Sequence, residues 1–272
     1  MDVLIVGAGA MGTWFGRAVD AAVTFTDVDA DAAATAADAV GSGADTTALE
    51  GTDSYDVVCL AVPMTHVTDA VADHADRAER AIVDVSGVMG PPLEAMATHA
   101  PDLERASLHP LFAPERAPGS IAVVSEDAGP TIETLLGDLT DRGNEPIETT
   151  ATEHDEAMET VQAATHAAVL SFALAAEPVP DGFETPIFEG LRTLVEKLTE
   201  GTPRVYADIQ GTFDGADRVA EAAATIADAD AAELESLYQA AAREWQPDDS
   251  EIKAPADDTT DATDTNGGST NE

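Results

Sequence analysis

Cysteine and long apolar runs are nearly missing from this sequence of 272 residues. The single cysteine, Cys59, cannot form an internal disulfide or a multi-cysteine metal site, and it lies inside an apolar run, where we interpret it as a small core residue. No apolar run approaches the roughly 20 residues that cross a bilayer, and no basic stretch followed by an apolar one resembles a secretion signal. We therefore expect a cytoplasmic protein that does not enter a membrane, and no metal site.

Positive charge is also scarce. There are 12 Lys and Arg residues against 53 Asp and Glu residues, so the formal net charge is −41. A field of this sign repels the phosphates of nucleic acids and the surfaces of anionic membranes, which excludes both as expected partners. The acidic residues are spread through the chain, as is typical of organisms that keep molar salt in their cytoplasm. At about 1 M salt the screening length falls to ~3 Å, which suppresses the self-repulsion of the chain.

Apolar runs alternate with helical patterns in the first half of the chain. Strands are predicted at 2–6, 23–27, 55–62 and 80–85, with helices at 13–19, 30–40 and 64–75. This order is typical of right-handed βαβ units. We expect an α/β fold: a doubly wound, mostly parallel sheet in residues 1–149, an all-α substrate and dimerisation domain in 150–246, and a disordered acidic tail in 247–272.

A glycine-rich turn joins the first predicted strand to the first helix. Gly7 permits the tight turn, Gly9 lets the backbone approach a pyrophosphate, and Gly12 allows the helix to pack close to the strand. Asp27 ends the second strand, where an acidic residue binds the ribose hydroxyls, and no arginine lies in residues 18–76 to accept a 2′-phosphate. The pattern predicts a Rossmann-type domain that prefers NAD to NADP. Its cofactor-binding residues are predicted to be Gly7, Gly9, Ala10, Met11, Gly12, Asp27, Ala61, Val62 and Pro63.

A histidine followed by proline indicates the chemistry. His109 comes just after a predicted strand, with Pro110 behind it. An imidazole held there can accept a hydroxyl proton while hydride leaves the same carbon, and its ordinary pKa suits that task near neutrality. On this pattern alone a loop histidine without catalytic function remains an alternative.

Together these motifs resemble the prephenate and arogenate dehydrogenases of tyrosine biosynthesis over residues 1–215. Members of this family share the glycine-rich start, a strand ending in Ala-Val-Pro, a turn similar to 84–88, and the His-Pro pair. The second half agrees, because 152–155 opens a helix that carries His166, and the segment 206–209 recurs in a later helix. The resemblance implies NAD-dependent oxidative decarboxylation of prephenate or arogenate by a homodimer formed through the helical domain.

The resemblance also assigns roles to individual residues. His109 falls on the catalytic histidine, and Ser86 lies in the turn whose serine contacts the reacting hydroxyl, although the family serine usually stands one place later, where this chain has Gly87. The family arginine that binds the ring carboxylate is replaced by Lys197, which makes Arg192 and Arg204 alternatives. The remaining residues expected at the substrate site are His166, Glu115 and Tyr206.

Two other functions stay open on the sequence. Dehydrogenases of the β-hydroxyacid type and deazaflavin-linked reductases share the glycine-rich start, but they do not explain the His109-Pro110 turn. A non-catalytic protein that senses a dinucleotide is conceivable because the serine and arginine positions are substituted. NADH formation on addition of prephenate distinguishes both from a prephenate dehydrogenase.

Overall fold

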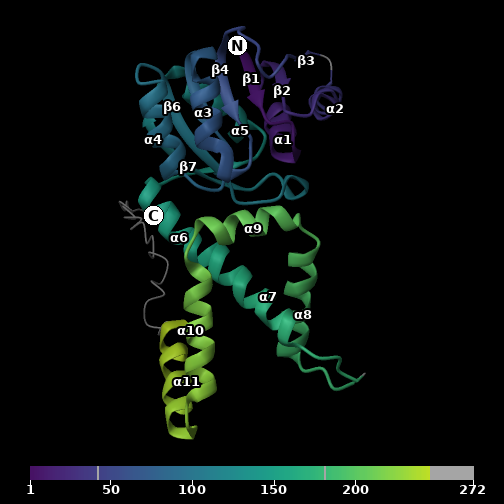
Figure 1. Ribbon diagram of the computed structural model, residues 1–272, viewed down its shortest axis with the longest axis vertical. Helices are drawn as coiled ribbons and strands as arrows, with labels where there is room; N and C mark the ends of the chain where they lie inside the picture. Colours follow the sequence, from purple (N-terminus) through teal and green to yellow (C-terminus); the bar gives the residue numbers. More distant parts are fainter. Residues whose placement is uncertain (42, 181, 246–272) are drawn as a thin grey trace, which may run out of the picture. The chain divides into compact units, whose positions relative to one another are not determined.

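A computed structural model describes residues 1–41, 43–180 and 182–245. The first half of the chain forms an eight-stranded sheet with the strand order β3-β2-β1-β4-β5-β6-β7-β8. Figure 1 labels most of these strands, at the top of the view. All pairings are parallel except β6 with β7. The strands are β1 (Asp2–Val6), β2 (Ala22–Thr26), β3 (Ala44–Thr46), β4 (Tyr55–Leu60), β5 (Ala78–Asp84), β6 (Glu104–Pro110), β7 (Ser120–Asp127) and β8 (Glu145–Glu148). The predicted mostly parallel sheet is therefore confirmed.

Helices cover both faces of this sheet. They are α1 (Ala10–Ala18), α2 (Ala30–Val40), α3 (Val67–His74), α4 (Gly90–His99) and α5 (Pro130–Asp141), with short 3₁₀ turns η1 (Met64–His66), η2 (Ala75–Arg77) and η3 (Pro114–Arg116). Side chains from α1, α2 and α5 pack on one face together with Val3 and Ile5, and side chains from α3 and α4 pack on the other with Leu4 and Val6. Successive side chains of β1 thus pack into the hydrophobic cores on opposite faces of the sheet. Because both faces are covered, the sequence of β1 from Val3 to Val6 is continuously apolar.

The chain is helical after β8, as predicted. Its elements are α6 (Ala151–Met158), a π-helical turn η4 (Glu159–Ala164), α7 (Thr165–Ala175), α8 (Pro186–Thr199), α9 (Pro203–Thr212), α10 (Gly215–Asp228) and α11 (Ala231–Trp245). Thr150 caps α6 by accepting a hydrogen bond from the Glu153 amide, so the helical region starts close to the predicted boundary.

Two compact units divide the described chain, Met1–Ala220 and the residues from Glu221 onward. The first unit holds the sheet together with α6 to α9, so the predicted division into domains at 149 and 150 stays a prediction. The tail predicted for 247–272 lies outside the described residues. Within the described ranges no helix is long and apolar enough to cross a membrane.

One local prediction needs correction. His109 belongs to β6 itself and does not follow it, because antiparallel pairing with β7 continues through the pairs His109–Ala122 and Pro110–Ile121. The helix predicted to open at 152–155 and to carry His166 contains the π turn η4 between α6 and α7, and the Thr165 hydroxyl donates to the Thr160 carbonyl there. Gly215 lies so close to this turn that a side chain there would overlap the Glu159 carbonyl and the Ala164 amide.

Candidate active site

The glycine-rich turn has the geometry of a phosphate cradle. Gly7 has φ +102°, which favours glycine, and a side chain there would collide with the Ala61 carbonyl. A side chain at Gly12 would collide with the Gly7 carbonyl. At Gly9, in contrast, an added Cβ would meet nothing within 4 Å, and α1 begins at the next residue. The turn thus offers open space and helix amides to an anion, which fits the pyrophosphate of a dinucleotide.

Asp27 holds this turn in place from the neighbouring strand. Its Oδ2 accepts a hydrogen bond of 2.7 Å from the Ala8 amide, and its Oδ1 accepts one of 2.9 Å from the Asp29 amide. The side chain is half-buried, and each carboxylate oxygen keeps a second lone pair for another donor. Asp27 is therefore placed to support the glycine-rich turn and still receive ribose hydroxyls.

The other predicted cofactor residues gather at the same edge of the sheet. Ala10 and Met11 form the first turn of α1, while Ala61, Val62 and Pro63 follow the end of β4. Glu115 joins them, because it lines one shallow groove with Ala8, Gly9, Ala10 and Thr13. The structure therefore brings Glu115 to the glycine-rich turn.

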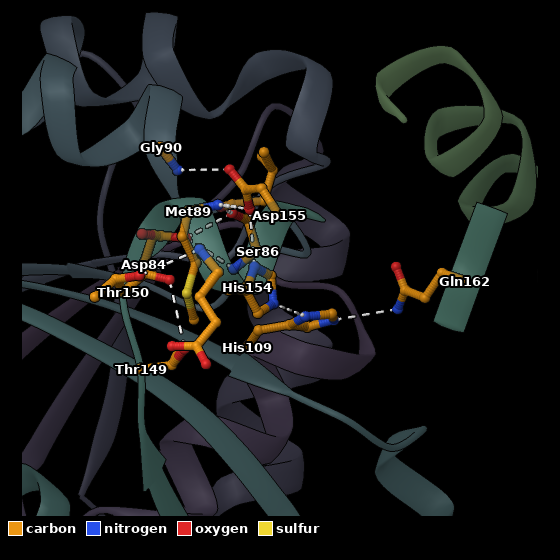
Figure 2. Close-up of polar contacts among 12 residues, drawn as sticks. Asp84, Ser86, Met89, Gly90, His109, Thr149, Thr150, His154, Asp155 and Gln162 are labelled. Atoms are coloured by element: carbon orange, nitrogen blue, oxygen red, sulfur yellow. Dashed lines mark hydrogen bonds and ion pairs between the residues drawn. The ribbon is translucent and has the colours of Figure 1, made fainter. Parts of the chain in front are cut away.

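His109 begins a chain of three hydrogen-bonded side chains. Its Nδ1 lies 2.8 Å from Nε2 of His154, and Nδ1 of His154 lies 2.8 Å from Oδ1 of Asp155 (Figure 2). Asp155 also accepts hydrogen bonds of 3.0 Å from the amides of Met89 and Gly90, where α4 begins. The Asp155 carboxylate therefore receives charge-stabilising donors on both oxygens.

The electrostatics of this chain fix where its protons lie. Although burial raises the pKa of Asp155, the hydrogen bonds from His154, Gly90 and Met89 hold it below its ordinary value. Burial, and then the neighbouring His154, lower the pKa of His109 to about 3. With Asp155 ionised, His154 Nδ1 carries its proton toward the carboxylate, and His154 Nε2 accepts the proton on His109 Nδ1. Nε2 of His109 is then the acceptor of this imidazole, but with a pKa of about 3 it is a weaker base than the near-neutral histidine predicted from the sequence.

Gln162 faces that acceptor from the π turn. Its Nε2 lies 3.4 Å from Nε2 of His109, as Figure 2 shows. Its other amide end, Oε1, is buried and makes no hydrogen bond to any part of the chain that the structure describes. His109 therefore meets one amide donor, and an acceptor with no partner lies beside it.

The turn after β5 places Ser86 and Gly87 differently. Oγ of Ser86 lies 2.6 Å from Oδ1 of Asp84 and 2.8 Å from the Val88 carbonyl, and both polar side chains are buried. Burial raises the pKa of Asp84 to about 6. A Cβ added at Gly87, in contrast, would lie 3.6 Å from Nε2 of His109, although the Met64 methyl would have to move. Position 87 thus faces His109, while the Ser86 hydroxyl is engaged inside the turn.

Apart from Ser86 and Glu115, the residues predicted for the substrate site lie in the helical region, whereas His109 lies in β6. His166 is the second residue of α7 and packs edge-to-face on Tyr206 of α9, with ring centroids 4.9 Å apart. Lys197 is exposed near the end of α8 and forms no ion pair with any described residue. Arg192 is paired with Glu184 and Glu196, and Arg204 with Asp208. The ion pairs leave Lys197 as the available cation of the three.

Sequence reasoning missed three residues of this site. His154 and Asp155 stand in the segment 152–155 that carries the family resemblance, but no role was expected for either, and Gln162 was not singled out. The spacing of residues along α6 gives no sign that His154 reaches back to β6. That contact depends on how the helical region packs on the sheet.

A dinucleotide cradle beside a buried histidine with a free acceptor nitrogen defines a dinucleotide-dependent dehydrogenase. The family model described as "Prephenate dehydrogenase, nucleotide-binding domain" matches residues 16–125. A 4-amino-4-deoxyprephenate dehydrogenase from Streptomyces pristinaespiralis is 33% identical over 236 residues, which cover 79% of this chain and 78% of that protein. The chain belongs to the prephenate dehydrogenase family.

Solved structures share the fold. The prephenate dehydrogenase of A. aeolicus, in complex with hydroxyphenyl propionate and NAD+, matches with a TM-score of 0.67 and 16% identity, over 90% of this chain and 97% of that one. The arogenate dehydrogenase of Synechocystis matches with a TM-score of 0.58 and 14% identity, over 88% and 97%. The description of the family model as a nucleotide-binding domain agrees with the dinucleotide site predicted from the sequence.

Proposed function

We propose that this protein catalyses the NAD-dependent oxidative decarboxylation of prephenate to 4-hydroxyphenylpyruvate, with arogenate as the alternative substrate. The observation that carries the proposal is the Asp155–His154–His109 chain, which leaves a buried, neutral imidazole nitrogen as an acceptor. The family and the fit of the glycine-rich turn to a dinucleotide add independent support.

The proposed reaction balances with NAD as its oxidant and without an added base. When bound, NAD accepts the hydride that leaves C4 of the substrate ring. The bond between C1 and the ring carboxylate breaks, CO2 leaves, and its electron pair completes the aromatic ring. The C4 hydroxyl remains as the phenol, so no net proton is released from the prephenate dianion.

His109 supports this step through its Nε2. The C4 hydroxyl donates to that nitrogen, and as positive charge develops at C4 its proton shifts toward His109 and returns to the phenol oxygen. Asp155 stabilises the charge that His109 briefly gains, and His154 links the two residues by accepting the imidazole proton on Nδ1 of His109. His109 is buried, which excludes water from the base.

The direct test is NADH formation on addition of prephenate or arogenate to the full chain with NAD. Turnover of either substrate supports the proposal, and the ratio of the two kcat/KM values reports which substrate the site prefers. If neither substrate yields NADH while the protein binds NAD and melts cooperatively, the chain does not have this activity.

A second candidate substrate is 4-amino-4-deoxyprephenate. Two observations favour it: the relative from Streptomyces pristinaespiralis carries that activity in its name, and Gln162 places an acceptor without a partner beside His109. The ring of this substrate carries an amino group where prephenate has its hydroxyl. The same hydride and CO2 would leave, and 4-aminophenylpyruvate would be the product.

The first prediction concerns the choice of cofactor. The turnover of substrate with NAD is expected to exceed that with NADP by about 100-fold or more in kcat/KM, because Asp27 repels a 2′-phosphate and like charges in contact cost several kcal/mol. Asp27→Asn should lower the ratio of kcat/KM with NAD to kcat/KM with NADP. Asp29→Asn changes the exposed residue that caps the start of α2, and it should leave that ratio unchanged. Comparable kcat/KM values for the two cofactors in the unaltered protein would contradict the assignment.

The second prediction concerns the ring carboxylate. We propose Lys197 as its partner, supported by the family position and by the ion pairs that occupy Arg192 and Arg204. Lys197→Ala is expected to raise KM for prephenate roughly tenfold or more, because a hydrogen bond to a charged group contributes about 1.5–3 kcal/mol. Lys197→Arg should retain binding. A silent Lys197→Ala, with an elevated KM in Arg192→Ala or Arg204→Ala, would transfer the role to that arginine.

The third prediction concerns solution conditions. We propose a protein adapted to a cytoplasm with molar salt, supported by the net charge of −41. Fold and activity are expected to require molar KCl, because carboxylates that repel one another in dilute buffer are screened at about 1 M salt. Thermal melts and NADH formation across a KCl series measure this. A cooperative melt and full activity in dilute buffer would refute it.

We also propose a homodimer formed through the helical region. The helix α8 contributes no buried residue within the chain, yet it carries Ile187 and Leu194 exposed, and Leu174 of α7 is 80% exposed. Apolar side chains gathered in this way are typical of surfaces that a partner covers. Sedimentation in molar KCl measures the mass, and a monomer at micromolar concentration would contradict the proposal.

A further inference from the structure

We propose that Gln162 selects the substituent at C4 of the substrate ring and that its amide allows the site to accept either a hydroxyl or an amino group there. This inference rests on the proposed function, because it assumes that C4 is presented to His109. It assigns to Gln162 a role in specificity, next to the histidine that accepts the proton.

The position of Gln162 is the first support. The widened π turn η4 directs this side chain to Nε2 of His109, at 3.4 Å, and π turns inside α-helices are frequent at functional sites. Gly87 also lies near this nitrogen, and it has no side chain that could contact a ring substituent. Among the described residues, Gln162 donates its amide to this nitrogen. A ring substituent that approaches His109 therefore meets Gln162.

The buried amide oxygen is the second support. Oε1 of Gln162 makes no hydrogen bond within the described chain, although a buried acceptor without a partner costs about 1–3 kcal/mol. A rotation of the amide by half a turn would bring Oε1 to the place of Nε2 of Gln162, next to the acceptor Nε2 of His109. A ligand with two donors on one atom would satisfy both.

The chemistry of the two substituents differs in the number of donors. A hydroxyl donates one proton, to His109, and its oxygen can accept from Nε2 of Gln162. An amino group offers at least two donors, one for His109 and one for Oε1 of Gln162 after the amide rotates by half a turn. The substituent binds as the neutral amine, which has lost its extra proton to solvent before it enters the buried site. One amide thus matches both substituents, since its two ends have opposite hydrogen-bonding character.

Substitutions at this position separate the two matches. Gln162→Glu keeps the size and the acceptor but removes the donor, so it should lower kcat/KM for prephenate about tenfold relative to the value for 4-amino-4-deoxyprephenate. Gln162→Met removes both functions and should lower kcat/KM for both substrates about equally. The ratio of the two values cancels any effect of the new charge on His109 itself. Thr160→Glu is the matched control, because it adds the same charge to an exposed position of the same turn.

Binding of non-reacting ligands gives a second readout that does not depend on turnover. Calorimetry with NAD present would compare 3-(4-hydroxyphenyl)propionate with 3-(4-aminophenyl)propionate for each variant. Gln162→Glu should shift the ratio of the two Kd values toward the amine, while Thr160→Glu should reproduce the ratio of the unaltered protein.

The outcomes are distinguishable. The inference is overturned if Gln162→Glu keeps the kcat/KM ratio and the Kd ratio of the unaltered protein. It is also overturned if Gln162→Met leaves both kcat/KM values unchanged. If a thermal melt shows that Gln162→Glu does not fold, Gln162→Met alone decides. If the unaltered protein forms NADH with neither substrate, the proposed function fails, and the calorimetric ratio still reports on Gln162. The inference about Gln162 is also overturned if the protein turns over only the hydroxyl substrate and every variant keeps the same ratio of Kd values for the hydroxyl and amino ligands.

Discussion

Replacing His109 with alanine is expected to lower kcat by roughly 10²–10⁴-fold, the range that general acid–base groups contribute. The Nε2 of this imidazole is the atom that meets the C4 substituent, and Gln162, whose amide contacts that nitrogen, is not a base. NAD binding should persist, because the glycine-rich turn depends on Gly7, Gly12 and Asp27 and not on His109. Steady-state kinetics and calorimetric titration with NAD measure the two quantities.

Two controls sharpen this expectation. His99→Ala changes an exposed histidine at the end of α4 and should leave kcat unaltered. Because His109 is buried, a thermal melt must show that the His109→Ala protein is folded. A folded variant with unchanged kcat would remove His109 from the mechanism, and a loss of NAD affinity equal to the loss of kcat would indicate a structural role.

Exchanging Asp155 for asparagine is expected to have the second largest effect. An amide cannot anchor the proton on His154 Nδ1 as a carboxylate does, so His154 loses its preferred tautomer and His109 loses the acceptor for its Nδ1 proton. In the serine protease triad the equivalent exchange costs about 10⁴-fold. Here we expect a decrease in kcat of roughly 10²-fold or more, with little change in KM.

The pH profile distinguishes this tautomer effect from simple protonation of His109. Burial lowers the pKa of His109 to about 3, so this base stays neutral above pH 5 and kcat/KM should show no inflection near 6.5 in the unaltered protein. The loss in Asp155→Asn should persist at every pH from 6 to 9. Recovery of activity at high pH would contradict the tautomer explanation. Glu156→Gln, at the exposed neighbouring position, is the matched control.

The sequence predicted what depends on local rules. Gly7, Gly9 and Gly12 could be assigned because a strand, a tight turn and a helix follow one another within a few residues, and the structure gives each glycine a definite steric reason or an open space. The continuously apolar β1 predicted a strand covered on both faces, which the two cores confirm. No strand was predicted for β7, although it is the next strand after β6 in the chain and pairs with it in the antiparallel direction.

The candidate site was less predictable because its contacts are long-range. Whether residue 86 or 87 faces His109 is decided by the course of the turn after β5, and the side chains of neighbouring residues in such a turn point in different directions. His154 reaches β6 from a helix 45 residues away, and a π turn directs Gln162. Sequence periodicity contains neither piece of information. The roles of Ser86, His166, Glu115, Tyr206 and Lys197 stay predictions.

Transfer of deuterium tests the central claim most directly. Prephenate carrying deuterium at C4 would be mixed with the enzyme and NAD in molar KCl, and the NADH and CO2 would be quantified by mass spectrometry. The account predicts one CO2 for each NADH, deuterium in the nicotinamide ring of the product, and negligible turnover with His109→Ala. NADH without deuterium, or CO2 released without NADH, would contradict hydride transfer from C4 as the reaction of this site.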